Sequence, residues 1–201
     1  MDKKLFASLC FGALLLMGTI SFQTADAELK FSLKFGTPGS SASNLQNPNN
    51  VLVSGSGNTI YVIDTGNHRI NAFEIDGDHD FKFGSFCDVD SIVACNTTSP
   101  GADNSGDGQF NNPKAAVLDS SNNLLYVADT ANDRIQVINV DNEGAFDYRF
   151  GSSGSADGKL NSPEGVALDK SEDLLYVADT GNNRIQVFDI DNVGDFSLTR
   201  I

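Results

Sequence analysis

The sequence contains no tryptophan and few basic residues. Of its 201 residues, 13 are lysine or arginine and 27 are aspartate or glutamate, which gives a formal net charge of −14. A negatively charged protein repels phosphate backbones, so the composition argues against nucleic-acid binding. The sequence also lacks a long apolar stripe with helical period, whereas Gly, Asn, Asp and Ser are abundant. This composition is typical of many short strands joined by turns.

Only one stretch is apolar enough to approach a membrane span, and it lies at the N-terminus. The basic start MDKK precedes the apolar run 5–22 and the small-residue site Ala25-Asp26-Ala27. This order is that of a secretory signal peptide, so we expect residues 1–27 to be removed and the protein to be secreted or held at the cell surface. Retention of the run as a membrane anchor is the alternative. After cleavage we expect no contact with the membrane.

One sequence is repeated three times in the mature region, 28–201. LYVADTGNNRIQVFDIDN begins at Leu175, LYVADTANDRIQVINVDN begins at Leu125, and the looser IYVIDTGNHRINAFEIDGD begins at Ile60. The later two copies are 50 residues apart, and the earlier two are 65 apart because an insertion follows Gly84. Repetition at a near-fixed period indicates an array of identical structural units.

Each copy divides into four short strands. In the third copy, strands are expected at 165–169, 174–179 and 184–190, with a fourth beginning at Phe196. A four-stranded antiparallel unit of this size cannot bury both of its faces alone, but copies stacked around an axis can. The sequence therefore predicts an all-β fold of three β-propeller blades, at about 37–84, 85–151 (with an insertion at 86–103) and 152–201.

The repeat resembles the NHL repeat. The resemblance rests on the pattern FG…G-D-G-x-x-N-x-P-x-x-V-A-x-D…L-Y-V-A-D-T-x-N-x-R-I-Q-V-F, which covers nearly all of the mature chain. The first copy departs from it, because NVLVS (50–54) lacks the aspartate found at Asp119 and Asp169. The resemblance implies a propeller, often six-bladed, and the fold alone implies no particular function.

Polar residues surround one tight turn in every copy. An aspartate precedes the turn, an asparagine lies within it and an arginine follows it, so a ring of catalytic or binding groups is one interpretation. The other is structural, with each aspartate capping its own turn and pairing with its arginine across the hairpin. We favour the structural interpretation because catalytic sites rarely recur in every blade. The residues are Asp64, Asn67 and Arg69, then Asp129, Asn132 and Arg134, then Asp179, Asn182 and Arg184.

The sequence offers little for binding a metal ion. DGDHD (76–80) has the alternating aspartates of a calcium loop, but Phe81 and Cys87 occupy the positions where such a loop needs Gly and Glu. We therefore interpret it as a turn, with weak calcium binding as the alternative. His68 occupies the turn position of Asp133 and Asn183, and we expect it to be an exposed substitution.

The resemblance also bears on catalysis. Amidating lyases of this repeat family hold zinc with histidines around the central channel, whereas the segments expected to line the channel here (50–54, 115–119 and 165–169) contain none. A nucleophile elbow, a phosphate loop and a paired-cysteine metal pattern are also absent from the sequence. We expect a non-enzymatic binding or scaffold module without a cofactor, whose ligand is a protein, a peptide or a carbohydrate. An incomplete, metal-dependent lyase or hydrolase is the alternative.

The insertion contains the two cysteines that remain after signal cleavage. We expect Cys87 and Cys95 to form a disulfide, because export permits oxidation; two free thiols are the alternative. Asn96-Thr97-Thr98 in the same segment matches the acceptor pattern for N-glycosylation.

Three blades do not close a ring. The sequence has three copies of the first three strands but four fourth-strand segments, at 30–36, 80–84, 145–151 and 195–201. Two chains could join into a six-bladed homodimer, with the surplus segment 30–36 at the junction. A fragment of a longer or decayed gene is the alternative.

Overall fold

The computed structural model describes residues 30–85 and 106–191. The chain divides into two compact units, Met1–Ser32 and Leu33–Ile201, and all regular secondary structure described below belongs to the second unit. Among the described residues, no helix is long and apolar enough to cross a membrane. The expected signal peptide, the two cysteines, Asn96 and the segment 195–201 lie outside the described residues.

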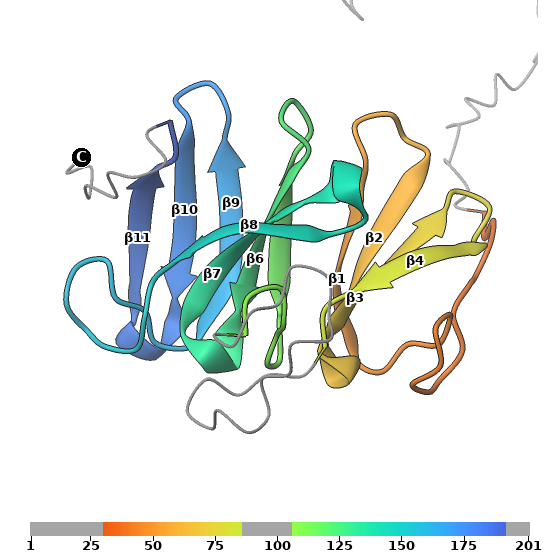
Figure 1. Ribbon diagram of the computed structural model, residues 1–201, viewed down its shortest axis with the longest axis horizontal. Coiled ribbons are helices and arrows are strands. Elements are labelled where there is room, and N and C mark those ends of the chain that lie inside the picture. The colour runs from red at the N-terminus through yellow and green to blue at the C-terminus, as the bar shows by residue number, and fades with distance from the viewer. Residues whose placement is uncertain (1–29, 86–105, 192–201) are drawn as a thin grey trace, which may run out of the picture. The chain divides into compact units, whose positions relative to one another are not determined.

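The second unit consists of three antiparallel sheets, each made of strands that follow one another in sequence (Figure 1). Within each sheet, strands that are consecutive in sequence pair antiparallel with one another. The first blade contains β1 (Pro48–Val53), β2 (Thr59–Asp64), β3 (Arg69–Glu74) and β4 (His79–Phe83); the second contains β5 (Ala115–Asp119), β6 (Leu124–Asp129), β7 (Arg134–Asn139) and β8 (Ala145–Phe150); the third contains β9 (Pro163–Asp169), β10 (Leu174–Asp179) and β11 (Arg184–Asp189).

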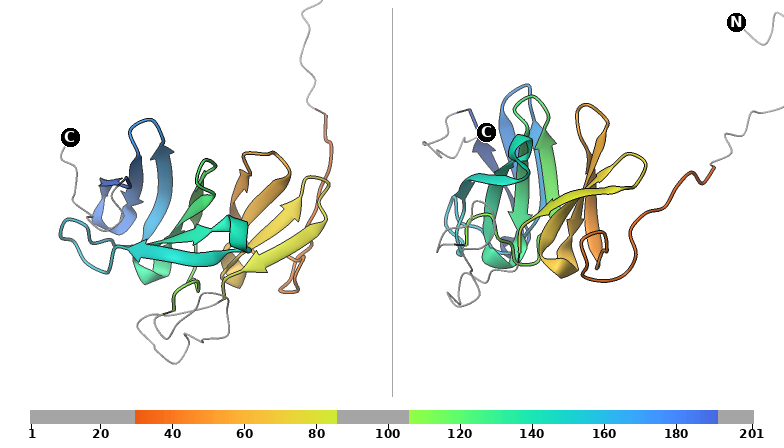
Figure 2. Two further views of the ribbon diagram at one scale, coloured as in Figure 1. Left: turned by 45° about the horizontal axis from the view of Figure 1, so that its top comes forward. Right: turned by 45° about the vertical axis from the view of Figure 1, so that its right-hand side comes forward.

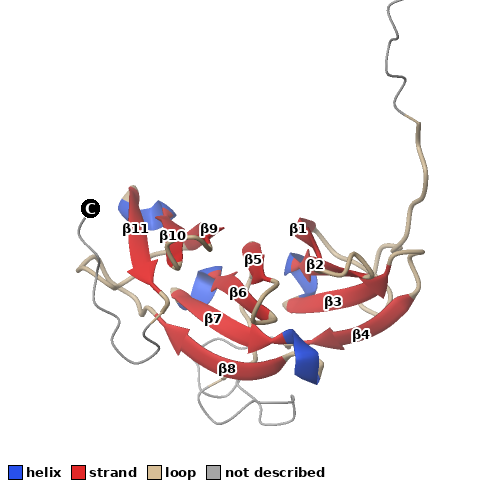
Figure 3. Ribbon diagram, turned by 90° about the horizontal axis from the view of Figure 1, so that it is seen from above, coloured by secondary structure: helices blue, strands red, loops and turns tan. Residues whose placement is uncertain are grey.

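The three blades are arranged in an arc, which confirms the all-β, partial-propeller prediction. Seen from above, β1, β5 and β9 lie along the inner side of the arc, and β4 and β8 lie along the outer side (Figure 3). The blades stand side by side in the other views as well (Figure 2). The inner strands are the segments that the sequence analysis expected to line a channel. The sheets do not close into a ring, so the first and third blades each have a neighbour on one side only.

Most of the hydrophobic core lies between the blades, and a smaller cluster of Ile60, Val62 and Phe73 in the first blade packs against Phe35 and Leu45. One cluster joins Tyr61, Ile63 and Ile70 of the first blade to Leu125 and Val127 of the second. A second cluster joins the other face of the second blade to the third, and includes the ring pair Phe150–Phe188 with centroids 4.8 Å apart. Each blade thus buries its apolar faces against neighbouring blades, which is why the sequence repeats.

The turn between the second and third strands of each blade is a short 3-10 helix, at Thr65–Asn67 (η1), Thr130–Asn132 (η2) and Thr180–Asn182 (η4). A further 3-10 turn, Val140–Asn142 (η3), joins β7 to β8. After η1, η2 and η4, the residue that follows adopts the left-handed conformation, with φ between 52° and 55°. These residues are His68, Asp133 and Asn183.

The Phe-Gly pairs have a steric explanation. Gly84 and Gly151 have φ values of 89° and 85°, which side chains other than glycine's rarely adopt. A Cβ atom would also lie 2.5 Å from the Phe110 ring at Gly84 and 2.6 Å from Leu160 at Gly151. Glycine therefore lets the chain leave the fourth strand and run directly beneath the apolar residue that opens the next blade.

Candidate functional site: the Asp-Arg clusters

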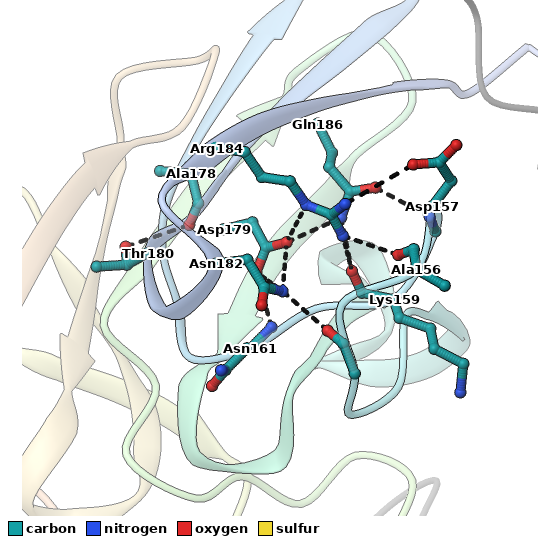
Figure 4. Close-up of polar contacts among 12 residues, drawn as sticks. Ala156, Asp157, Lys159, Asn161, Ala178, Asp179, Thr180, Asn182, Arg184 and Gln186 are labelled. Carbon is teal, nitrogen blue, oxygen red and sulfur yellow. Dashed lines mark hydrogen bonds and ion pairs between the residues drawn. The ribbon is translucent and has the colours of Figure 1, made fainter.

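The polar residues that recur in each repeat come together in one compact cluster, shown for the third blade in Figure 4. Arg184 Nε donates to Asp179 Oδ2 at 2.7 Å, and Asn182 Nδ2 donates to the same oxygen at 2.9 Å. The other carboxylate oxygen accepts the backbone N–H of Asn161 at 2.7 Å. Gln186 Nε2, from β11, adds a fourth donor at 3.0 Å. The Asp179 carboxylate is therefore surrounded by donors on both oxygens.

The same geometry recurs in the first two blades. Arg69 Nε and Arg134 Nε donate to Asp64 Oδ2 and Asp129 Oδ2 at 2.8 and 2.7 Å. Asn67 and Asn132 donate to these oxygens at 2.8 and 2.9 Å. The backbone N–H groups of Gln46 and Asn111, each 18 residues before its aspartate, complete the pattern at 2.6 Å.

The arginines hold a loop as well as a carboxylate. Arg134 Nη2 donates to the carbonyl oxygens of Gly106 and Gln109 at 2.9 and 3.0 Å. In the third blade, Arg184 Nη2 donates to those of Ala156 and Lys159, both at 2.8 Å. Each cluster therefore ties the hairpin to the loop that leads into the first strand of the same blade.

This arrangement corrects one part of the sequence interpretation. The aspartates pair with their arginines, but Asp64, Asp129 and Asp179 make no side-chain hydrogen bond that caps the 3-10 turn. The carboxylate instead accepts a backbone N–H from a loop far away in sequence. The left-handed residue of this turn is Asn183, which follows Asn182, and not the turn glycine Gly181.

The residue two positions after each arginine also belongs to the cluster, although it was not predicted from the sequence. Gln136 is buried and bridges the cluster, because its Nε2 donates to Asp129 and to the Gln109 carbonyl while its Oε1 accepts the N–H of Gly108 at 3.0 Å. The first blade has the shorter Asn71 at this position, and its buried Oδ1 has no hydrogen-bond partner among the described protein groups. The recurrence of Gln at 136 and 186 was the signal available in the sequence.

The electrostatics of the clusters follow their burial. Burial raises the pKa of Asp129 above its ordinary value, against the opposing effects of Arg134 and the N–H of Asn111. Burial acts in the same direction on Asp179, but hydrogen bonds from Asn182 and Arg184 outweigh it and bring the pKa below its ordinary value. The second blade has a neighbour on each side, whereas the third blade has a neighbour on one side only. The carboxylate of Asp179 in the third blade is therefore less strongly desolvated than that of Asp129.

A second turn built around a carboxylate recurs between the first and second strands of the second and third blades. Asp119 Oδ1 accepts the N–H of Ser121 at 2.9 Å, and Asn122 Nδ2 donates to Oδ2 at 2.8 Å. Lys170 of the third blade places its Nζ 3.3 Å from the same carboxylate. Burial raises the pKa of Asp119, but these hydrogen bonds bring it below its ordinary value. Asp169 forms the equivalent turn with Ser171.

Hydrogen bonds from the turns also join neighbouring blades. Thr65 Oγ1 donates to the carbonyl oxygen of Pro113 at 2.6 Å, and Thr130 Oγ1 donates to that of Pro163 at 2.7 Å. The threonine that follows the cluster aspartate therefore binds the proline that opens the next blade. This contact gives both recurrent residues a structural role.

His68 takes part in the same junction, which corrects the expectation of an exposed substitution. It is partly buried, and its Nδ1 accepts the backbone N–H of Asn112 at 3.0 Å. Asp133 Oδ1 accepts the N–H of Ser162 at 2.7 Å in the equivalent place. Burial lowers the pKa of His68, although Asp64 opposes the effect, and the neutral form is the one that can accept through Nδ1.

The described residues offer no ready metal site. Within 30–85 and 106–191, no group of three or more His, Cys, Asp or Glu side chains is placed to hold a metal ion. The DGDHD segment forms a turn in which the N–H of Asp78 donates to Asp76 Oδ1 at 3.1 Å. The nine predicted Asp, Asn and Arg residues come together blade by blade, in three separate clusters, rather than in one common site.

The NHL repeat family matches the chain at residues 110–138 and 160–188, which cover nearly all of the first three strands of the second and third blades. The two later copies are therefore similar to NHL repeats, as the sequence pattern indicated. No curated protein matches the sequence with significance.

Solved structures resemble the fold at low sequence identity. A protein of Bacteroides fragilis proposed to be exported superposes with a TM-score of 0.56 and 15% identity, covering 88% of this chain and 44% of its own. A Lactobacillus plantarum protein gives 0.50 and 15%, covering 76% and 40%. The periplasmic gluconolactonase of Pseudomonas aeruginosa gives 0.49 and 12%, covering 76% and 38%. The chain thus spans less than half the length of these structures, and the likeness concerns the fold alone.

Proposed function

We propose that the protein is an exported NHL-repeat propeller module that binds a ligand and does not catalyse a reaction. The observation that carries this proposal is that both oxygens of every cluster carboxylate already accept hydrogen bonds. In each blade the Asp carboxylate already accepts from an Arg, an Asn and a backbone N–H. A carboxylate so occupied is a poor general base, because a substrate proton would have to compete with these donors.

Export is supported by the signal-like N-terminus of the sequence and by the fold neighbour from Bacteroides fragilis that is proposed to be exported. The ligand would be a protein, a peptide or a carbohydrate that contacts the loops at the ends of the blades or the inner strands β1, β5 and β9. Such surfaces vary between propellers while the clusters stay fixed by the fold.

The experiment is a metal measurement combined with a ligand screen on the purified exported protein. Metal content is determined by mass spectrometry, and glycan and peptide libraries are screened by thermal shift, since a ligand that binds only the folded state raises Tm. We expect no stoichiometric metal and a saturable ligand that is recovered unchanged. One zinc per chain, or conversion of a bound ester, lactone or peptide, would favour the lyase or hydrolase alternative instead.

A further inference from the structure

The two ends of the arc expose residues whose counterparts are buried inside it. Ile185 on β11 is 63% exposed, whereas Ile70 and Ile135 at the corresponding positions are completely buried against the next blade. On the opposite end of the arc, Val51 and Val53 of β1 are 60% and 54% exposed. Their counterparts on β5 face the first blade and belong to the core there. Each end of the arc therefore exposes a face of the kind that packs against a neighbouring blade inside the arc.

The polar groups on these faces complement each other. Thr65 and Thr130 each donate to the carbonyl of the proline that opens the next blade. Thr180 is their counterpart in the third blade, where it is exposed and, within the described part of the chain, its hydroxyl donates to the Ala178 carbonyl at 3.4 Å and to no neighbouring blade. The proline carbonyl that would match it belongs to Pro48, at the start of β1. A threonine donor and a proline acceptor thus stand at opposite ends of the same chain.

A second hydrogen bond between neighbouring blades also has its donor and its acceptor at opposite ends of the chain. At the internal junctions, the N–H before the proline donates to His68 Nδ1 or to Asp133 Oδ1. The corresponding acceptor on the third blade is Asn183, and the corresponding donor on the first is the N–H of Asn47. Asn47 has φ of 48°, the same left-handed conformation as Asn112 at 49°, so the donor is already oriented for the contact.

The segment before the first blade packs against that blade in the way that the fourth strand of a preceding blade does at the internal junctions. Phe35 packs on Phe73 with ring centroids 4.9 Å apart, just as Phe150 of the second blade packs on Phe188 of the third. Beside the first blade, Phe35 thus occupies the position that Phe150, at the end of β8, occupies beside the third blade. At position 200, where the third blade's own Phe should stand, the chain has Arg.

From these matches we propose that the free face of the third blade binds the free face of the first blade of a second copy of this chain. Thr180 then donates to Pro48 O of the partner and Asn183 accepts from the partner's Asn47 N–H. Phe150 pairs with Ile135 across β7 and β8, so the same register places the partner's Phe35 opposite Ile185. Made twice, the contact closes two three-blade arcs into one six-bladed ring with two-fold symmetry. The proposal does not depend on the ligand-binding function.

Light scattering with size-exclusion chromatography tests the proposal on the purified exported protein. We expect twice the mass of one chain for the wild type and the mass of one chain for Ile185→Asp, because a carboxylate in an apolar interface is costly. The matched control is Ser120→Asp. Ser120 is exposed and lies in the turn between β5 and β6 of the second blade, which has a neighbour on each side within one chain, so this variant should remain dimeric. A monomeric wild type, or an Ile185→Asp variant that stays dimeric, would overturn the proposal.

A cysteine cross-link tests the register and does not depend on how well Ile185→Asp folds. Residues directly opposite on antiparallel strands lie close enough for a disulfide. In a Cys87→Ser/Cys95→Ser background, we expect Phe35→Cys/Ile185→Cys to form covalent dimers on oxidation and Ser120→Cys/Ile185→Cys, with one cysteine in the middle blade, to form none. Within one chain the two ends of the arc lie far apart (Figure 3), so the link must join two copies. Absence of the Phe35–Ile185 link, or an open series of larger multimers, would contradict the closed ring.

Discussion

Arg134 Nε lies 2.7 Å from Asp129 Oδ2, and both side chains are buried in the blade that has neighbours on both sides. A buried ion pair is expensive to break from one side, because the partner left behind keeps its charge without compensation. The pair also connects the β6–β7 hairpin to the loop that contains Gly106 and Gln109. The first prediction concerns the free-energy cost of breaking it.

Arg134→Ala should reduce the free energy of unfolding by about 3–5 kcal/mol, which is the usual cost of removing one partner of a buried ion pair and leaving the other buried and charged. The matched control is Lys114→Ala, which removes the exposed ion pair between Lys114 of the second blade and Glu164 of the third. Loss of an exposed pair costs about 0–1 kcal/mol. Denaturant unfolding of both variants measures the difference, and equal losses would show that the Arg134 cluster is not a major stabilising element.

Asn71→Gln should stabilise the first blade. Gln136 and Gln186 each accept, through the side-chain oxygen, the backbone N–H that lies 28 residues earlier. The side-chain oxygen of Asn71 has no partner among the described protein groups, and the longer side chain of Gln would bring it within reach of the equivalent N–H in the first blade. One added hydrogen bond contributes about 0.5–1.5 kcal/mol, measurable by denaturant unfolding. The reverse change, Gln136→Asn, should destabilise the second blade. A loss of stability in Asn71→Gln would mean that the first blade has no room for the bridge.

The repeat in the sequence was sufficient to predict the blades. In the third copy the repeat placed strands at 174–179 and 184–190, within one residue of β10 and β11. The resemblance to the NHL repeat and the comparison by family agree on the second and third copies. Local pattern and global stacking lead to the same structure here, as is expected of a repeat protein.

The contacts of the clusters could not be predicted in the same way. Asp64, Asp129 and Asp179 were identified with their arginines because these residues lie five positions apart on one hairpin. The backbone donors lie 18 residues upstream, in loops whose path depends on the positive φ values of Gly36 and Gly151 and their neighbours. Hydrogen bonds between blades, such as that of His68, depend on stacking and leave no local trace in the sequence.

Asp119 predicts a specific acid sensitivity. Its folded pKa lies below the ordinary value, so folding favours the ionised form. The stability it contributes is therefore fully present above the unfolded pKa of about 3.9 and is lost as the pH falls through the folded pKa. We expect the free energy of unfolding to decrease below about pH 4, and Asp119→Asn to show a shallower decrease over the same range.

Ser121→Ala provides the intermediate case for this titration. It removes the hydroxyl that donates to Asp119 and leaves the carboxylate in place, so the folded pKa should move back toward its ordinary value. Denaturant unfolding at a series of pH values compares the three proteins. Parallel pH profiles for the wild type and Asp119→Asn would show that this carboxylate does not contribute to the acid limb.

The disulfide between Cys87 and Cys95 remains a prediction, since both residues lie outside the described parts of the chain. Alkylation of the native exported protein should find no free thiol, and alkylation after reduction should find two. Closing so short a loop contributes about 2–3 kcal/mol at most. Two free thiols in the native protein would rule the disulfide out.

The central claim of this account is that the Asp-Arg clusters hold each hairpin to the loop upstream of it. Amide hydrogen exchange at Asn161, measured by NMR in the wild type and in Asp179→Ala, tests it most directly, because the N–H of Asn161 donates to Asp179 Oδ1 at 2.7 Å. The account predicts that Asn161 loses its protection in the variant, while Asn111, which donates to Asp129 in the second blade, keeps its own. Unchanged protection at Asn161 would contradict the claim.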